Sequence, residues 1–284
     1  MKFTVFAFVL WGVLAIYWKQ LAHIQPLEIL FHRIIWTTLI LGLFLSLQKK
    51  ISFSRLFKSP RNTIFALLSS LLIGASWYFF IWAISNGFVL EASFGYFISP
   101  IFTLFLAMIF LREPQSKRKI FSIILSIVSV VWLTFGYGRF PFVGVGLGLI
   151  FGFYSLTKKQ SRLGAGEGVF FEAGFLLIPA LMMPFFLGFD YFQSATTNLP
   201  TNIFLLVGGG FATALPLTLY AMGAQRISLS KLGVLQYIAP TLQFFVGLLV
   251  FREKLHLNTL FGFVILWIAI FIYLAEDFHR FENS

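Results

Sequence analysis

Few side chains in this sequence could do chemistry, and four of them interrupt long apolar segments: Lys19, His32, Arg33 and Glu172. Ionisable groups inside such segments are costly to bury and are functional candidates by default. His32 and Glu172 could each bind and release a proton, although they should lie near opposite membrane faces and not pair directly, and Lys19 and Arg33 could anchor an anionic group. Other roles stay open: Lys19 could neutralise Glu28, Arg33 could pack helices or reach lipid headgroups, and Glu172 could be a simple interfacial carboxylate.

A second set of candidates combines aromatic rings with polar groups. Large rings with polar handles suit a cavity for an amphipathic or aromatic solute. We expect contacts with such a solute from Trp77, Trp82, Asn86, Tyr96, Tyr154, Gln236 and Tyr237.

Part of this set of contact residues lies in two apolar segments that each contain a proline. The stretch Glu91–Glu113 aligns with Lys231–Glu253 at an offset of 140 residues, which places Pro100 on Pro240. Proline removes the amide that would bond the carbonyl four residues earlier, so the carbonyls of Tyr96 and Gln236 should be freed. A single helical proline is commonly a packed kink, but interrupted helices at matching positions of two repeats indicate a binding site in a transporter.

Catalytic motifs are missing from the sequence. It contains no HExxH, GxSxG or Walker A motif and no paired carboxylates. With no cysteine, thiol chemistry and cysteine metal sites are excluded. We therefore expect no enzyme, no cofactor, no metal site and no ATP-driven pumping within this chain.

The elements that must position these residues are membrane helices. Of 284 residues, 59% are hydrophobic and only 11% are charged. Apolar segments of about 20 residues are long enough to span a bilayer as helices. The prediction is an all-α integral membrane protein with ten spans: Phe3–Ala22, Leu27–Leu47, Asn62–Ile84, Leu90–Leu111, Lys119–Phe135, Phe140–Leu156, Val169–Leu187, Asn202–Ala224, Lys231–Phe251 and Asn258–Ala275.

The net charge of +11 indicates topology and argues against nucleic-acid binding. If the amino terminus is inside, most lysines and arginines fall in cytoplasmic links, and only Arg139, Arg252 and Lys254 fall on the other side. The positive-inside rule then predicts that both termini are cytoplasmic. The first span lacks a small-residue cleavage site after it, so it should be a retained helix.

The repeat covers more than the proline segments. At the same offset Gly12 aligns with Gly152 and Lys19 with Lys159, so each repeat holds five spans and the second is inverted in the membrane. The predicted repeats are residues 1–140 and 141–284. Gly144, Gly148 and Gly152 share one helix face, a pattern that lets helices approach closely.

Several stretches resemble a known family. They include Tyr17-Trp18-Lys19, Glu28 with His32-Arg33, Ala92–Ile98 up to Pro100, Phe151-Gly152 with Tyr154, and Leu235–Thr241. Together they cover nearly the whole chain and resemble the EamA-type group of the drug/metabolite transporter superfamily, and more narrowly its RarD, or chloramphenicol-sensitivity protein, family. Ser99 departs from the asparagine common at that position, and Phe171-Glu172-Ala173 departs from an expected Leu-Glu-Thr-like triplet.

The resemblance implies an inner-membrane carrier. Its central cavity would be lined by spans one, three, four, six, eight and nine and would open alternately to either side. Our hypothesis is a secondary transporter, with export as the expected direction, for small organic metabolites that are amino-acid-like or aromatic. The expected partners are this solute and membrane lipid, and a homodimer is left open. A lipid-handling membrane protein or a non-transporting assembly partner is the alternative.

Overall fold

The computed structural model describes residues 1–135, 140–187, 199–252 and 256–282. Within these residues the secondary structure is helical throughout, which confirms the predicted fold class. Arg139, Glu253 and Lys254, which enter the charge and repeat arguments, lie outside the described residues. The helices are α1 (Lys2–Gln20), α2 (Pro26–Leu47), α3 (Phe53–Phe57), α4 (Pro60–Ser85), α5 (Val89–Phe110), α6 (Lys117–Phe135), α7 (Phe142–Gln160), α8 (Ala165–Leu187), α9 (Leu199–Ala224), α10 (Leu229–Gln236), α11 (Ile238–Leu249) and α12 (Leu257–Glu282).

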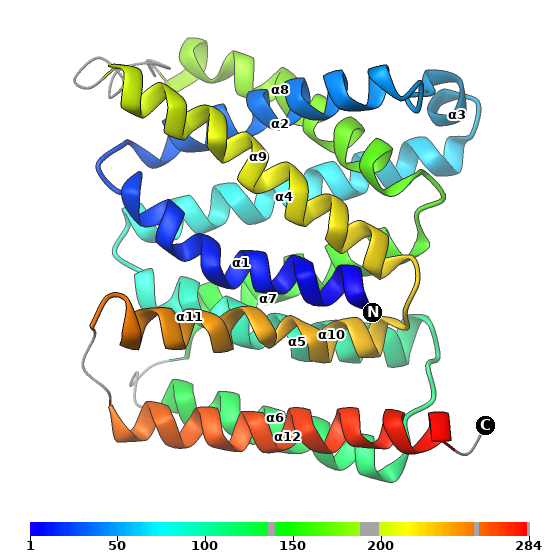
Figure 1. The fold of residues 1–284 in the computed structure, drawn as a ribbon, viewed down its shortest axis with the longest axis vertical. Helices are drawn as coiled ribbons and strands as arrows, with labels where there is room; N and C mark the ends of the chain where they lie inside the picture. The colour runs from blue at the N-terminus through cyan, green and yellow to red at the C-terminus, as the bar shows by residue number, and fades with distance from the viewer. Residues whose placement is uncertain (136–139, 188–198, 253–255, 283–284) are drawn as a thin grey trace.

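Ten spans arise if α10 and α11 are counted as one and the short α3 is left out. Eight of these spans are both long and apolar enough to cross a membrane, judged by length and composition over the described residues. The other two are α6, which begins with three basic residues, and the glycine-rich α7. Both have the length of a span and lie alongside the others in the bundle (Figure 1).

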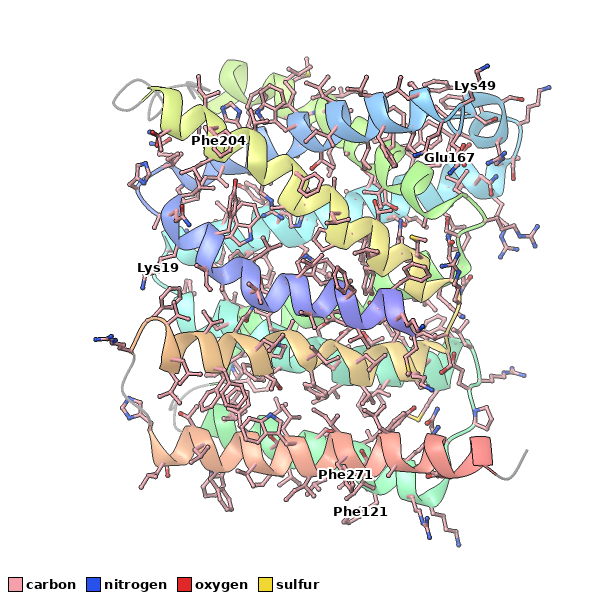
Figure 2. All side chains as sticks on the ribbon, in the orientation of Figure 1. Lys19, Lys49, Phe121, Glu167, Phe204 and Phe271 are labelled. Atoms are coloured by element: carbon pink, nitrogen blue, oxygen red, sulfur yellow. The ribbon has the colours of Figure 1, made fainter. Side chains whose placement is uncertain are left out.

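The helices lie side by side, and both ends of the chain are at the same end of the bundle (Figure 1). We call this the terminal end. Lys49 and Glu167 lie at the terminal end and Lys19 at the opposite end (Figure 2). The exposed rings of Phe121, Phe204 and Phe271 project from the sides, as expected for surfaces that face lipid chains.

The two predicted repeats pack mainly against each other. Helix α1 contacts α9 and α11, whereas α7 contacts α4 and α5. Helix α2 packs on α8 and α9, α8 also packs on α4, and α6 packs on α12. When each helix is replaced by its equivalent at the 140-residue offset, every one of these contacts becomes another contact in the same set or remains the same contact. The two halves are therefore interlocked, and the repeat boundary itself remains a prediction.

The glycine face of α7 explains its close packing against α5. A Cβ built on Gly144 would lie 2.7 Å from the carbonyl oxygen of Glu91, and one on Gly148 would lie 2.9 Å from Cγ2 of Ile98. The backbone amide of Val143, at the start of α7, donates to the Glu91 carboxylate at 3.0 Å. Glu91 therefore stabilises the amino terminus of α7.

The two prolines have different effects on their helices. Helix α5 continues through Pro100, whereas the equivalent span is divided at Tyr237 into α10 and α11. In the second case the amide of Tyr237 bonds the carbonyl of Val234, three residues back, which tightens the turn before Pro240. The expected interruption of both spans is thus found only in the ninth.

Candidate functional site

The side chain of Arg33 is the meeting point of several helices inside the bundle. Its guanidinium carbon lies 4.8 Å from the ring centroid of Trp18 on α1 and 4.5 Å from that of Trp77 on α4. Its Nε donates to the hydroxyl of Thr213 on α9 at 3.1 Å. The Tyr96 hydroxyl on α5 is close enough to interact with it electrostatically. Arg33 and Trp77 are therefore neighbours, as expected for parts of one site.

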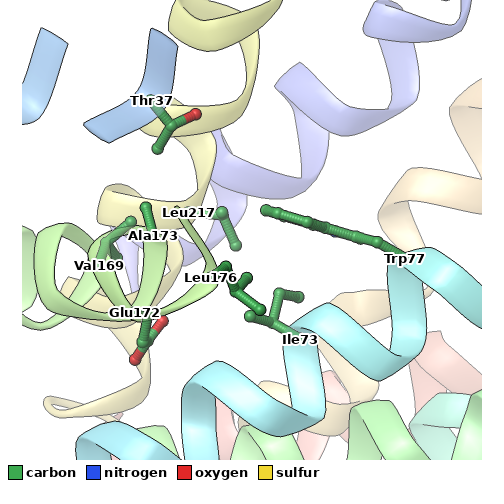
Figure 3. Close-up of a pocket in the computed structure, with 8 residues that line it drawn as sticks. All are labelled: Thr37, Ile73, Trp77, Val169, Glu172, Ala173, Leu176 and Leu217. Carbon is green, nitrogen blue, oxygen red and sulfur yellow. The ribbon is translucent and has the colours of Figure 1, made fainter. Parts of the chain in front are cut away.

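Trp77 also lines a small cavity. Its volume is about 10 Å³, and it is lined by Thr37, Ile73, Trp77, Val169, Glu172, Ala173, Leu176 and Leu217 (Figure 3). Thr37 lies one helical turn beyond Arg33 on α2. A volume of this size holds about one water molecule and no organic solute. In this conformation the cavity is thus too small for a solute, and Trp77 both lines it and contacts Arg33.

Glu172 forms a buried ion pair at the far wall of this cavity. The Lys158 ammonium donates to its Oε1 at 2.6 Å, and the two side chains are only 1% and 5% exposed. The Tyr154 hydroxyl donates to the other carboxylate oxygen at 3.2 Å. Glu172 is therefore neither a free carboxylate nor an interfacial one, and Tyr154 belongs to the same cluster.

Gln236 joins the two halves of the chain through hydrogen bonds. Its amide nitrogen donates to Thr103 on α5 at 3.1 Å and to Ser155 on α7 at 3.3 Å. Its amide oxygen accepts from Ser99 on α5 at 3.2 Å. Ser155 also accepts from Tyr220 on α9 at 2.6 Å. Small hydroxyl residues thus surround the amide at the end of α10, where the ninth span is divided.

The tyrosines on the two sides of this network differ in exposure. Tyr96 faces Arg33 and is 45% exposed. Tyr154 and Tyr220 are fully buried and stack on each other at 6.0 Å. Every residue of α10 from Leu229 to Gln236, apart from Lys231, is buried. The bundle is therefore sealed toward the terminal end.

Three predicted contact residues lie away from this interior. Trp82 stacks on Phe79 and Phe88 near the end of α4, and the Asn86 side chain bonds the Trp82 carbonyl at 2.8 Å. Tyr237 is buried against Phe263 and neighbouring residues of α12. The predicted contact set therefore divides, with Trp77, Tyr96, Tyr154 and Gln236 around the interior and Trp82, Asn86 and Tyr237 outside it.

The four candidate ionisable groups do not form one cluster. The Lys19 ammonium lies 3.5 Å from the ring centroid of Phe251, at the opposite end of the bundle. His32 is buried, and its Nδ1 accepts a hydrogen bond from Trp36 one turn later on the same helix. Only Arg33 and Glu172 lie near the cavity. Among the residues that the structure describes, no three His, Asp or Glu side chains gather as metal ligands.

The sequence interpretation missed two partners, Trp18 and Lys158. Neither is among the candidate residues predicted from the sequence, yet each contacts a candidate ionisable group. The repeat offset contained a signal, because Trp18 aligns with Lys158 and His32 with Glu172. Positions that are equivalent in the two repeats thus hold, in both halves, a residue that contacts an ionisable side chain of the interior.

Known proteins resemble this chain over most of its length. The model of the EamA-like transporter family matches residues 1–135. The chain is 35% identical over 275 residues to the uncharacterized transporter YojE of Bacillus subtilis, covering 95% of this chain and 92% of that protein. It is 32% identical over 275 residues to protein RarD of Escherichia coli K12, with the same coverage of both chains. A more distant relative, at 25% identity over 274 residues, is the chloramphenicol-sensitive protein RarD of Pseudomonas aeruginosa, with 94% of this chain and 90% of that protein covered.

A solved protein structure also matches the fold. It superposes with a TM-score of 0.77 over 96% of this chain and 95% of its own, at 14% sequence identity. This similarity supports the arrangement of the helices and carries nothing about the solute.

Proposed function

Because the chain belongs to the RarD family of EamA-like transporters, we propose that it is a secondary transporter that exports small organic metabolites, amino-acid-like or aromatic, by alternating access. The observation that carries the proposal is the asymmetry around Gln236. On one side lies Tyr96, which is 45% exposed, and on the other lie the fully buried Tyr154 and Tyr220. A bundle closed at one end and accessible from the other is one of the two states that alternating access requires.

The hydrogen bonds of Gln236 support movement between the two repeats at this point, and we call the contact of Gln236 with Ser99, Thr103 and Ser155 the seam. They connect α10 to α5 and α7, which belong to different predicted repeats. The nearby division at Tyr237 leaves backbone without regular helical pairing, which membrane proteins tolerate where it is buried in protein or lines a cavity. We propose that the two repeats move relative to each other about this seam.

Residue roles follow from the positions described above. Trp77, Tyr96 and Gln236 would contact the solute, because they surround the interior between the accessible and closed sides. Glu172 would take up a proton, because it lines the cavity and its carboxylate is already paired with the Lys158 ammonium. His32 remains a candidate for proton coupling, and Lys19 for a gate at the opposite end.

The proposed location is the inner membrane, with both termini in the cytoplasm. The terminal end carries Lys49 and Lys58 in the link after α2, and Arg118 at the start of α6. Basic links lie on the cytoplasmic side of inner-membrane proteins. The accessible side with Tyr96 would then face outward.

Counterflow in proteoliposomes tests the proposal. Purified protein is reconstituted with an internal metabolite mixture, and exchange with isotope-labelled solutes outside is measured by mass spectrometry, with and without a pH gradient. We expect exchange of one solute class in liposomes with protein and none in liposomes without it. If folded protein exchanges no solute, the carrier proposal is wrong and a lipid-handling or assembly role replaces it.

A further inference from the structure

Two cationic side chains lie in the interior of the bundle, and the protein neutralises only one of them. The Lys158 ammonium has the Glu172 carboxylate at 2.6 Å. No carboxylate among the described residues pairs with the Arg33 guanidinium, whose only protein hydrogen bond there runs from Nε to Thr213. The two terminal nitrogens of Arg33 therefore have no protein acceptor within the part of the chain that the structure describes.

An arginine at this depth needs compensation. Arg33 begins the third turn of a 22-residue span, well inside the apolar segment. A charge in a membrane interior normally pairs with another residue or faces a water-filled path. The rings of Trp18 and Trp77 supply cation–π attraction, which is a partial replacement for an anion. The protein thus holds the guanidinium in place without neutralising it.

The contacts of Arg33 leave the edge formed by its two terminal nitrogens available to bind an anion. Trp18 and Trp77 contact the guanidinium through their rings, and Thr213 occupies the Nε position. The free terminal nitrogens form the planar fork that binds a carboxylate through two parallel hydrogen bonds. Tyr96 interacts electrostatically with Arg33 and is partly exposed. The site is therefore shaped for a carboxylate that arrives from the accessible side.

From this geometry we infer that Arg33 binds the carboxylate of the transported solute, so that the substrates are small organic anions with an apolar body. The inference rests on the proposed transport function and narrows its substrate class. Trp77 contacts Arg33 and also lines the cavity, so its ring is available to pack against the apolar body of the solute. Lys158 does not compete for the solute, because Glu172 occupies it.

Counterflow with matched pairs of solutes tests the inference. The pairs are N-acetylphenylalanine with its amide and N-acetylleucine with its amide, which differ in charge and hardly in size. We expect exchange of the two acids to exceed that of their amides at least about tenfold, a ratio that corresponds to one charged contact. Liposomes without protein correct for passive leakage.

Variants of Arg33 locate the effect. Arg33→Gln removes the charge and should lower exchange of both acids at least about tenfold, while Arg33→Lys, which keeps the charge without the fork, should fall between it and the original chain. Arg61→Gln is the matched control, because Arg61 also contacts an aromatic ring, that of Phe65, but is exposed. It should leave exchange unchanged. Size-exclusion profiles and thermal melts in detergent establish that each variant is folded.

The outcomes separate the two proposals. Equal exchange of amides and acids, or unchanged acid exchange by folded Arg33→Gln, overturns the anion inference and leaves the transporter proposal standing. The anion inference is also overturned, with the transporter proposal left standing, if only neutral or cationic solutes of the metabolite mixture are exchanged. Absence of exchange for every solute by folded protein contradicts both. If Arg33→Gln does not fold, the comparison of acids with amides in the original chain and in Arg33→Lys decides.

Discussion

The ammonium of Lys158 lies 2.6 Å from a carboxylate oxygen of Glu172, and both side chains are buried inside the bundle. Each charge is therefore stable only in the presence of the other. Lys158→Met should leave Glu172 as an uncompensated buried acid and destabilise the protein by roughly 3–5 kcal/mol, and Lys158→Met with Glu172→Leu should recover most of that loss. Denaturation in detergent followed by circular dichroism measures both effects. Arg55→Gln is the control: its Glu167 partner is buried but Arg55 is 56% exposed, so a loss as large as that of Lys158→Met would contradict the argument.

Gly144 and Gly174 make a matched pair for the packing of α7. A Cβ on Gly144 would lie 2.7 Å from the Glu91 carbonyl oxygen, whereas one on Gly174 meets nothing within 4 Å. Gly144→Ala should separate α7 from α5 and destabilise the protein by roughly 1–3 kcal/mol. Gly174→Ala should stabilise it by up to about 1 kcal/mol, because alanine is the better helix former. Thermal melts of the two variants in one detergent compare them directly, and equal shifts would show that α7 and α5 are not in close contact.

Gln236 can be tested against another glutamine of the same span. Gln236→Leu removes the amide that bonds Ser99, Thr103 and Ser155, and we expect it to reduce counterflow severely and to lower stability by roughly 1–3 kcal/mol. Gln243→Leu is the control, because Gln243 makes a single long bond of 3.5 Å to the Trp11 carbonyl. Normal exchange by folded Gln236→Leu would show that the seam is not part of transport.

Trp77 and Trp82 lie on one helix but should differ in importance. Trp77 contacts Arg33 and lines the cavity, so Trp77→Ala should lower exchange about tenfold or more. Trp82 stacks on Phe79 and Phe88 outside the interior, so Trp82→Ala should keep exchange within about threefold of the original. Exchange rates normalised to the amount of reconstituted protein check this. A larger loss for Trp82→Ala than for Trp77→Ala would show that the solute passes near Trp82 instead.

The spans were predictable because length and apolarity alone define membrane helices. The glycine face of α7 was equally readable, since Gly144 and Gly148 recur at one face of any helix. The behaviour of Pro100 was not, because continuation of a helix through proline depends on neighbours that compensate the freed backbone groups. The neighbours around Pro100 come from distant parts of the sequence: a Cβ on Gly148 of α7 would lie 3.0 Å from the Ser99 amide nitrogen, and one on Gly233 of α10 would lie 3.1 Å from the Pro100 carbonyl oxygen.

Side-chain partners were the least predictable part. Lys158 looks like any basic residue at a helix end, and only the folded structure shows that its ammonium bonds Glu172 of α8. Trp77 and Trp82 are equally good candidates in sequence, and the position of Arg33 distinguishes them. Composition identifies which side chains are costly to bury in a membrane, whereas the packing of the helices determines which of them are in contact.

The most direct test of alternating access uses the absence of cysteine from the chain. Tyr96→Cys and Ser155→Cys place single thiols on the accessible and the closed sides of Gln236, and a membrane-impermeant maleimide is applied from either side of oriented vesicles. The account predicts that Tyr96→Cys reacts from the side opposite the termini, and that Ser155→Cys is protected until an exchanged solute is added, after which it reacts from the terminal side. Reaction of both thiols from one side, whether or not solute is present, would contradict it.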